Sequence, residues 1–547
     1  MTRPMLLSLL AGSTLLAIAS KPTSANETHW AGSASEAVRC ESLAETDFSN
    51  LHDAATQIST ANLVVAVGEL LGDLGWPELD ALRDLAVKHA GSVQPYCRVR
   101  GYVTSNVGFE LLLPVSHWNG KFLQVGCGGW CGTTGYVGLS CVLHPGYACI
   151  STDMGHTGAG GVWFRSNLQG QIDFSYRATH VTALAGKAVT EHYYSKKPER
   201  SYFLGCSTGG YQGMVEVQRF PWDFDGIVAG APDMDESDLA ARGIWIKQSF
   251  LGHGAKPLLT PGQIRRVHQA ALSRCDLDDG VRDGIISDPV HCKFDPADLL
   301  CKADSRGAEA DCLTAQQVQA VKNIYGAPVN SKGIALSTRG VFPGSENLWS
   351  EEFAETWGDE YFKATELVSE PGKHWNYADF DFDRDYARSG VGVVFTDTNP
   401  DLRKFKAAGG KLIVYQGGND VLEIPGAVVD YYETVEKTMG GRSATQDFFR
   451  LFVIPGMNHC TGGDGAFAVD YLSYLEQWVE QGKVPDVMIG AHPDGLQKLE
   501  SWLLKFPLEP DVHVAFTRAL YPYPQYAKYI GRGDPNKAEN FKPVLPH

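Results

Sequence analysis

The pentapeptide Gly205-Cys206-Ser207-Thr208-Gly209 follows directly after the apolar run Tyr202-Phe203-Leu204. This G-x-S-x-G pattern fits the sharp strand-to-helix turn that exposes a nucleophilic serine. Glycines flank such a turn because it is too tight for side chains on either side. The pentapeptide therefore predicts acyl transfer. The alternative is an ordinary glycine turn, since the chain contains 59 glycines and the pattern alone is weak.

An acid and a base follow this serine in the order that the chemistry needs. Asp420 comes shortly after the apolar run 411–415, and His459 comes shortly after the run 451–455. Functional groups of α/β sheets gather at the carboxyl ends of strands. Ser207, Asp420 and His459 therefore fit the chain order of the α/β-hydrolase arrangement. The alternative is that His459 caps a loop and Asp420 begins a turn before a helix.

The expected roles of these three residues follow from the weakness of a serine hydroxyl as a nucleophile at neutral pH. His459 would take the proton of Ser207 during attack and return it to the leaving alcohol. Asp420 would hold the imidazole in the required tautomer and stabilise the imidazolium.

An oxyanion also needs backbone N–H donors. One is expected from Thr208, the residue after the nucleophile, and one from an earlier glycine loop. The segment Gly126-Cys127-Gly128-Gly129 follows the strand-like run 121–125, so Gly128 or Gly129 is the predicted second donor. A purely structural glycine turn is the alternative.

The whole chain sets limits on the class of protein. Residues 1–25 have the basic start, apolar stretch and small-residue end of a secretory signal, with cleavage expected after Ala25. No later segment is apolar for long enough to cross a membrane. The formal net charge is −17, which argues against nucleic acid or an anionic membrane as a partner. A secreted or periplasmic protein is therefore predicted.

The twelve cysteines are an even number in an exported chain, so disulfides are expected. Close spacing favours the pairs Cys275 with Cys292 and Cys301 with Cys312, and Cys40 is expected to pair with Cys97. Four others, at positions 127, 131, 141 and 149, allow three connectivities. The alternative to a disulfide near the histidine is a metal site made by Cys206, Cys460 and His459.

The predicted fold class is α/β, with a hydrolase core interrupted by a large inserted lid. Short apolar runs separated by glycine-rich turns indicate strands between about 109 and 150, and the segment 176–196 has helical spacing before the strand 201–205. Strand patterns then fade until residue 411. The predicted division is a signal peptide at 1–25, core at 26–232, lid at 233–396 and core again at 397–547.

Cys206-Ser207, Asp420 and His459-Cys460 together resemble the CS–D–HC motif of the tannase and feruloyl esterase family. The resemblance spans nearly the whole mature chain. It implies an α/β-hydrolase core with a lid inserted between the serine and aspartate strands. It also implies a disulfide between Cys206 and Cys460, which would tie the serine turn to the histidine loop. A physical reason supports such a tie, because misplacing catalytic groups by ~1 Å can cost ~100-fold in rate.

The segment from Cys275 to Ile285 packs four aspartates into a glycine-bent loop. Calcium prefers such oxygen ligands. The loop is not an EF-hand, but it resembles the calcium loop in the lid of this family. The resemblance implies a structural calcium ion bound by the carboxylates of Asp276, Asp279 and Asp283 and by the carbonyls of Val281 and Ile285, away from Ser207. A solvated acidic turn is the alternative.

These observations predict a secreted serine carboxylesterase that hydrolyses small aromatic esters, feruloyl, galloyl or related, through an acyl-enzyme. Alternatives are a lipase or peptidase on the same core, or a catalytically inactive, calcium-dependent binding protein. Lid aromatics could stack on a phenolic ring, but most of them are expected to be core residues. The segment 344–362 has six acidic residues and no lysine or arginine, which argues against substrates with a free carboxylate. The lid aromatics considered are Trp245, Trp349, Phe353, Trp357, Tyr361 and Trp375.

Overall fold

The computed structural model describes residues 34–546 apart from 66, 71–93, 159, 253–255, 303–311, 350–360, 363–374, 387–394 and 495–511. The predicted signal peptide lies outside the described residues. Within the part that is described, no helix combines the length and apolarity needed to cross a bilayer.

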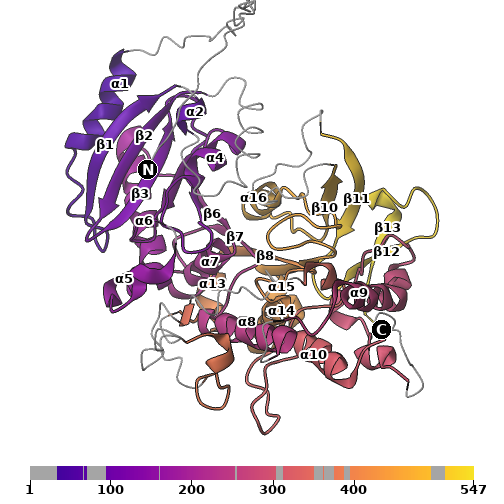
Figure 1. Cartoon of the computed structure of the whole chain (residues 1–547). Coiled ribbons are helices and arrows are strands. Elements are labelled where there is room, and N and C mark those ends of the chain that lie inside the picture. Colours follow the sequence, from indigo (N-terminus) through magenta and orange to yellow (C-terminus); the bar gives the residue numbers. More distant parts are fainter. Residues whose placement is uncertain are drawn as a thin grey trace, which may run out of the picture.

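A nine-stranded mixed sheet forms the core of the molecule (Figure 1). Its order is β1-β2-β3-β5-β4-β6-β7-β8-β9; the first four pair antiparallel, and from β5 onward all neighbours are parallel. The parallel strands are almost wholly buried, as expected where helices cover both faces. The strands are β1 (Thr56–Val64), β2 (Tyr96–Val103), β3 (Val107–Pro114), β4 (Lys121–Val125), β5 (Ala148–Thr152), β6 (Arg200–Cys206), β7 (Gly226–Gly230), β8 (Lys411–Gly417) and β9 (Phe449–Ile454).

Helices pack on both faces of this sheet, which confirms the predicted α/β class. A side chain at Gly213 of α7 would meet Ile227 and Ala229 of β7, whereas one at Gly226 would meet Leu475 of α16. Adjacent strand residues point to opposite faces, so α7 and α16 cover opposite sides. The α-helices in the described part of the chain are α1 (Ala34–Glu41), α2 (Val67–Leu70), α4 (Tyr136–Leu143), α5 (Leu168–Ile172), α6 (Ala178–Tyr194), α7 (Thr208–Arg219), α8 (Glu236–Leu251), α9 (Pro261–Cys275), α10 (Ala315–Tyr325), α13 (Arg403–Ala407), α14 (Pro425–Thr438), α15 (Arg442–Gln446) and α16 (Tyr471–Gln481).

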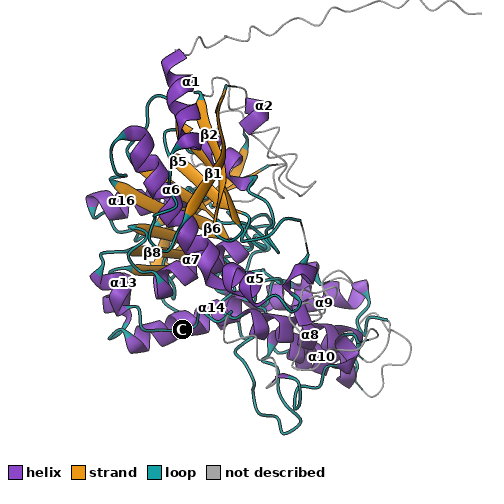
Figure 2. Cartoon of the chain, turned by 90° about the vertical axis from the view of Figure 1, so that its left-hand side faces the viewer, coloured by secondary structure: helices purple, strands orange, loops and turns teal. Residues whose placement is uncertain are grey.

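Between β7 and β8 the chain leaves the sheet and builds a separate helical layer. Helices α8, α9 and α10 gather beyond one end of the sheet (Figure 2), around their own apolar cluster, which includes Phe250, Val267 and Val321. The two ends of this insertion meet again, because Asp235 and Thr396 form an antiparallel bridge. The insertion therefore leaves and re-enters the core at one place.

After the main sheet the chain forms two small antiparallel sheets, β10 (Met488–Pro493) with β11 (Val514–Leu520), and β12 (Tyr526–Tyr529) with β13 (Phe541–Val544). Strand β12 packs against the short helix Asp276–Asp279 that follows α9 (Figure 1). In β11, Arg518 Nη2 lies 2.6 Å from Asp283 Oδ2. The acidic loop of the insertion is thus held against the C-terminal strands.

Six disulfides use all twelve cysteines, each of which lies in the described part of the chain. The pairs predicted from spacing and from the family resemblance are confirmed: Cys40–Cys97, Cys275–Cys292, Cys301–Cys312 and Cys206–Cys460. The connectivity left open is Cys127–Cys131 and Cys141–Cys149.

Asp153, just after β5, generates a prediction about pH and stability. Its buried carboxylate accepts hydrogen bonds from the N–H groups of Gly108 (2.9 Å) and Gly155 (2.8 Å). Burial nevertheless raises the pKa of Asp153 from 3.8 to about 6. Folding therefore favours the protonated form, whose stabilising contribution is complete below about pH 4 and lost as the pH rises through 6.

The Asp153→Asn variant should therefore gain in Tm relative to the natural protein as the pH is raised from about 4 to about 7. The pKa change corresponds to roughly 3 kcal/mol at most. Thermal unfolding of both proteins across this range measures the Tm difference, and a difference that does not change with pH would contradict the prediction.

Candidate active site

Ser207 lies at the turn between β6 and α7. Its backbone has φ 61° and ψ −128°, a left-handed conformation that costs free energy for a residue with a side chain. A side chain at Gly205 would come within 2.5 Å of the carbonyl oxygen of Gly209. The tight turn predicted from the pentapeptide is therefore present, and it requires glycine at 205.

Asp420 and His459 come from the loops after β8 and β9. The strand register aligns Cys206 with Gly230, Gly230 with Tyr415, and Gly417 with Ile454, so the three loops emerge at the same edge of the sheet. His459 Nδ1 lies 2.9 Å from Asp420 Oδ2.

The Asp420 carboxylate is fully buried and held from several sides. Its Oδ1 accepts hydrogen bonds from the N–H groups of Leu422 (2.9 Å) and Glu423 (3.0 Å), and its Oδ2 accepts one from Gln416 Nε2 at 3.0 Å. These donors stabilise the charged carboxylate and fix the oxygen that faces the imidazole.

The disulfide Cys206–Cys460 joins residues 254 positions apart, with a Cα–Cα distance of 5.9 Å. One cysteine precedes Ser207 and the other follows His459, so the bond connects the two loops directly. Cys460 Sγ lies 3.6 Å from His459 Nε2. The disulfide therefore excludes the rival metal site, because both sulfur atoms are used in the bond.

Glu423 is a neighbour of Ser207 that the sequence patterns did not indicate. Ser207 Oγ donates to Glu423 Oε1 at 3.5 Å. Burial raises the pKa of Glu423 well above its usual value, while His459 lowers it and Glu236 and Asp420 raise it further. Glu423 therefore contacts both Ser207, through its carboxylate, and Asp420, to which its backbone N–H donates. The only signal in the sequence is the position of Glu423 three residues after Asp420.

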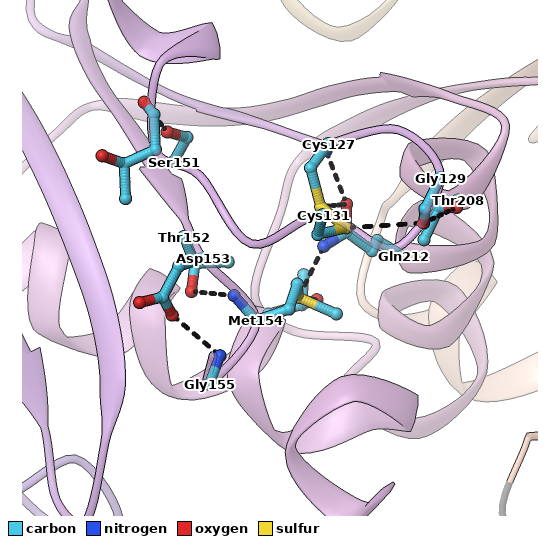
Figure 3. The surroundings of a disulfide bond; sticks show 12 residues. Cys127, Gly129, Cys131, Ser151, Thr152, Asp153, Met154, Gly155, Thr208 and Gln212 are labelled. Carbon is cyan, nitrogen blue, oxygen red and sulfur yellow. Dashed lines mark hydrogen bonds between the residues drawn. A yellow bond between two sulfur atoms is a disulfide. The ribbon is translucent and has the colours of Figure 1, made fainter. Parts of the chain in front are cut away.

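The glycine loop after β4 lies against the serine turn. A side chain at Gly126 would come within 2.5 Å of Gly209 Cα, so the two backbones are in direct contact. Thr208 Oγ1 donates to the carbonyl of Gly129 at 2.7 Å, and Gln212 Oε1 accepts from the N–H of Cys127 at 3.1 Å (Figure 3). The Cys127–Cys131 disulfide closes the loop.

The predicted oxyanion donors therefore belong to one tightly held unit. The N–H of Thr208 is in the first turn of α7, where helix geometry supplies no acceptor within the helix. Gly129 has φ 54°, a left-handed conformation that glycine adopts readily. Gly128 precedes it in the same loop.

The acidic loop places its predicted calcium ligands close to one another, but not in a closed cage. Asp279 is fully buried and Asp276 nearly so. Burial raises the pKa of Asp279 to about 6 and also raises that of Asp276. Asp283 is paired with Arg518. The oxygen donors suit calcium in type. The ligand oxygens of the three carboxylates, however, do not all lie within 4.8 Å of one another; among the described residues, a different group has that spacing.

The acidic loop was predicted to lie away from Ser207, but its end lies close to the loops of the candidate site. A side chain at Gly418 would meet Pro289, and one at Gly456 would meet Ile285. Gly418 and Gly456 belong to the loops that carry Asp420 and His459. Ile285, at the end of the acidic loop, thus packs on the His459 loop, and Pro289, four residues further along the chain, packs on the Asp420 loop.

The group that does meet the 4.8 Å spacing is His180, Glu216 and Asp223, between α6 and α7. His180 Nδ1 lies 2.6 Å from Asp223 Oδ2, and the positive charge of the half-buried Lys187 acts on both Glu216 and Asp223. The lysine supplies the balancing charge in this cluster, which makes it an internal ion network.

Two of the lid aromatics considered for stacking are packing residues. Trp349 and Tyr361 are buried, and the Tyr361 hydroxyl lies 3.0 Å from Ser237 Oγ. Trp245 and Trp375 pack partly buried against the main core. Phe353 and Trp357 lie outside the described residues, as do most of the acidic residues of 344–362.

The positioning role of the Cys206–Cys460 disulfide can be tested by comparing its removal with removal of the Cys301–Cys312 disulfide in the lid. Replacing Cys206 and Cys460 together by alanine should lower both Tm and the rate of hydrolysis of an activated ester, the latter by about 100-fold, since the loops lose their fixed spacing. Replacing Cys301 and Cys312 together should lower Tm alone. Equal effects of both double variants on kcat would contradict a positioning role.

Comparisons with known proteins agree with this geometry. The sequence model described as "Tannase and feruloyl esterase" matches residues 91–544. The chain is 32% identical to the mono(2-hydroxyethyl) terephthalate hydrolase of Piscinibacter sakaiensis, over 87% of this chain and 90% of that protein. It is also 32% identical to a probable feruloyl esterase B-1 of Aspergillus oryzae, over 80% of this chain and 82% of the relative.

Comparison of the fold with solved structures points to the same family. The crystal structure of feruloyl esterase B from Aspergillus oryzae superposes with a TM-score of 0.76 at 28% identity, covering 93% of this chain and 100% of that one. The chain therefore belongs to the tannase and feruloyl esterase family, whose α/β-hydrolase fold it shares, and it is a carboxylic ester hydrolase.

Proposed function

We propose that this protein is a serine esterase that works through an acyl-enzyme, with Ser207 as nucleophile, His459 as base and Asp420 as the residue that orients the base. The observation that carries the proposal is the placement of Ser207 on a strained turn, joined through one disulfide to the loop of a histidine that lies 2.9 Å from a buried aspartate.

The reaction would proceed in two halves. In the first, Ser207 Oγ attacks the ester carbonyl, its proton passes to His459 Nε2, and the proton then moves to the leaving alcohol. In the second, water attacks the acyl-enzyme with the same histidine as base. The N–H groups of Thr208 and of Gly128 or Gly129 would stabilise the oxyanion in both halves; one such donor typically contributes ~3 kcal/mol.

The substrate class proposed is an ester of an aromatic acid, feruloyl, galloyl or a related aryl ester. Support comes from relatives whose names specify feruloyl esters and mono(2-hydroxyethyl) terephthalate. The alternatives are a lipase or peptidase on the same core and an inactive binding protein. Export to an oxidising compartment belongs to the same proposal, and six disulfides support it.

Replacing Ser207 by alanine should abolish turnover of methyl ferulate and of 4-nitrophenyl acetate, with a drop in kcat of at least about 10³-fold. The variant should keep a Tm close to that of the natural protein, because removing the serine hydroxyl removes no contact that is essential to packing. A fluorophosphonate probe should label the natural protein and not the variant. Residual activity like that of the natural protein, or labelling of both, would refute the assignment.

We further propose that the acidic loop binds a structural calcium ion through Asp276, Asp279, Asp283 and the carbonyls of Val281 and Ile285. Calcium supplies positive charge to carboxylates that burial otherwise disfavours, and it would stabilise the loop that packs on Gly418 and Gly456. The donor type and the burial of Asp279 support this assignment.

Chelation of calcium should lower the Tm of the natural protein by several degrees, since the ion binds only the folded loop. The Asp279→Asn variant serves as the matched control and should respond little to chelation. Elemental analysis gives a readout independent of activity, with about one calcium per chain expected. Unchanged Tm after chelation together with no bound calcium would overturn the assignment in favour of a solvated acidic turn.

A further inference from the structure

Gln212 lies one helical turn after Thr208 on α7 and connects that helix to the glycine loop after β4 (Figure 3). Residues four positions apart lie on the same face of a helix, so both side chains reach the loop. Gln212 is only 1% exposed and has almost no surface with which to contact a substrate. Any part that it takes in the reaction is therefore exerted through the loop, and rests on the proposed serine esterase function.

The side-chain amide of Gln212 is held at both ends. Its Oε1 accepts from the N–H of Cys127 at 3.1 Å, and its Nε2 donates to the sulfur of the buried Met154 at 2.7 Å. The same sulfur accepts from the Thr179 hydroxyl at 3.6 Å. A side chain at Gly126 would come within 2.8 Å of Gln212 Oε1, so the amide occupies space that this glycine leaves open. The amide oxygen is thereby kept directed toward the loop.

The N–H groups of the glycine loop fall into two sets. The N–H of Gly126 donates to a carbonyl of β6 at 2.9 Å, and that of Cys127 donates to Gln212. The N–H groups of Gly128 and Gly129 have no acceptor among the described residues. Gln212 thus binds the last N–H before the two from which the second oxyanion donor is expected.

The carbonyl groups of this segment are also held. The carbonyl of Gly128 accepts from the N–H of Cys131 at 2.9 Å, and that of Gly129 accepts from the Thr208 hydroxyl at 2.7 Å. Helix α7 therefore binds the loop at two points, the N–H of Cys127 and the carbonyl of Gly129. Between these points lie the two peptide groups that carry the N–H of Gly128 and the N–H of Gly129. Because peptide groups are planar, fixing both ends restricts the directions of these two N–H groups.

The other expected oxyanion donor belongs to the same rigid unit. The N–H of Thr208 is at the start of α7, and the side chains that bind the loop come from the first two turns of that helix. Oxyanion donors act when they lie about 2.7–3.1 Å from the position of the developing charge. A misplacement of ~1 Å can cost ~100-fold in rate. A hydrogen bond from α7 to the loop can therefore control the rate without contacting the reacting atoms.

We propose that Gln212 is a positioning residue for the oxyanion hole. By holding the N–H of Cys127, it directs the N–H groups of Gly128 and Gly129 toward the oxyanion, while the Thr208 hydroxyl holds the other end of the segment. The alternative is a structural role alone, in which Gln212 satisfies a buried N–H and stabilises the fold. The two roles differ in kinetics, because a group that supports only the transition state changes kcat and kcat/KM equally.

The Gln212→Met variant keeps a side chain of similar length and removes the acceptor. With 4-nitrophenyl acetate, kcat and kcat/KM should both fall by about 10- to 100-fold, with KM changed by less than about threefold. The inhibitor 2,2,2-trifluoroacetophenone tests the oxyanion directly. Ser207 Oγ would add to its ketone carbon, the serine proton would pass to His459, and the ketone oxygen would become the oxyanion, with no leaving group. Its Ki should rise by about the same factor as kcat falls.

Gln218 provides a matched control on the same helix. Its side chain is half-buried, accepts from the N–H of Asn399 at 2.9 Å and donates to the carbonyl of Asp397 at 2.6 Å. Gln218→Met makes the same substitution away from the glycine loop. It should lower Tm and leave kcat and Ki within about twofold of the natural values. Equal losses of kcat in the two methionine variants would overturn the positioning role.

Thr208 tests the second attachment point and does not depend on whether Gln212→Met folds. Thr208→Val keeps the backbone N–H and the shape of the side chain but removes the hydroxyl, so kcat should fall and Ki should rise by about tenfold or more. Thr208→Ser keeps the hydroxyl and should stay within about threefold of the natural protein. Equal kcat and Ki values in the valine and serine variants would overturn attachment of the loop at two points.

The natural protein separates failure of this inference from failure of the proposed function. If it neither hydrolyses 4-nitrophenyl acetate nor is inhibited by 2,2,2-trifluoroacetophenone, the proposed function itself fails. If it does both, and Gln212→Met changes neither kcat nor Ki, the function stands and the positioning role of Gln212 is wrong.

Discussion

The Cys206–Cys460 disulfide is the constraint on which the candidate site depends. Strand register already brings the ends of β6, β8 and β9 to one edge of the sheet, but the loops that follow carry residues in left-handed conformations, Ser207 at φ 61° and Cys460 at φ 59°. A covalent bond between these loops holds that strained arrangement. It also closes a loop of 254 residues, which contains the whole inserted layer, so the lid can vary without changing the spacing of serine and histidine.

The sequence predicted those parts of the structure that rest on local patterns. The serine turn and the strands that carry Asp420 and His459 follow from apolar runs and glycines along the chain. The pairing of Cys206 with Cys460 needed the family resemblance, since nothing in their spacing connects them. Strands β1 and β2 are not among the predicted strands, because polar residues at exposed positions interrupt the apolar pattern of β1.

Tertiary packing explains what the sequence did not indicate. Glu423 reads as one more acidic residue before a helix, and only the fold turns its carboxyl group toward Ser207. The acidic loop was expected to lie apart from the site, yet Pro289 and Ile285 reach the loops of Asp420 and His459. Trp349 and Tyr361, by contrast, fill the interior of the inserted layer and its junction with the core, as expected for most of the aromatics in this segment. Side-chain direction and long-range contacts decide the first two cases.

The central claim is that Ser207 becomes covalently acylated during turnover. Rapid mixing with an activated aryl ester, acid quench and peptide mass spectrometry measure this directly. The account predicts that the acyl mass appears on the peptide containing Ser207 within the first turnover and disappears as substrate is consumed. Acylation at another residue, or turnover without any acylated peptide under conditions where deacylation is slow, would contradict it.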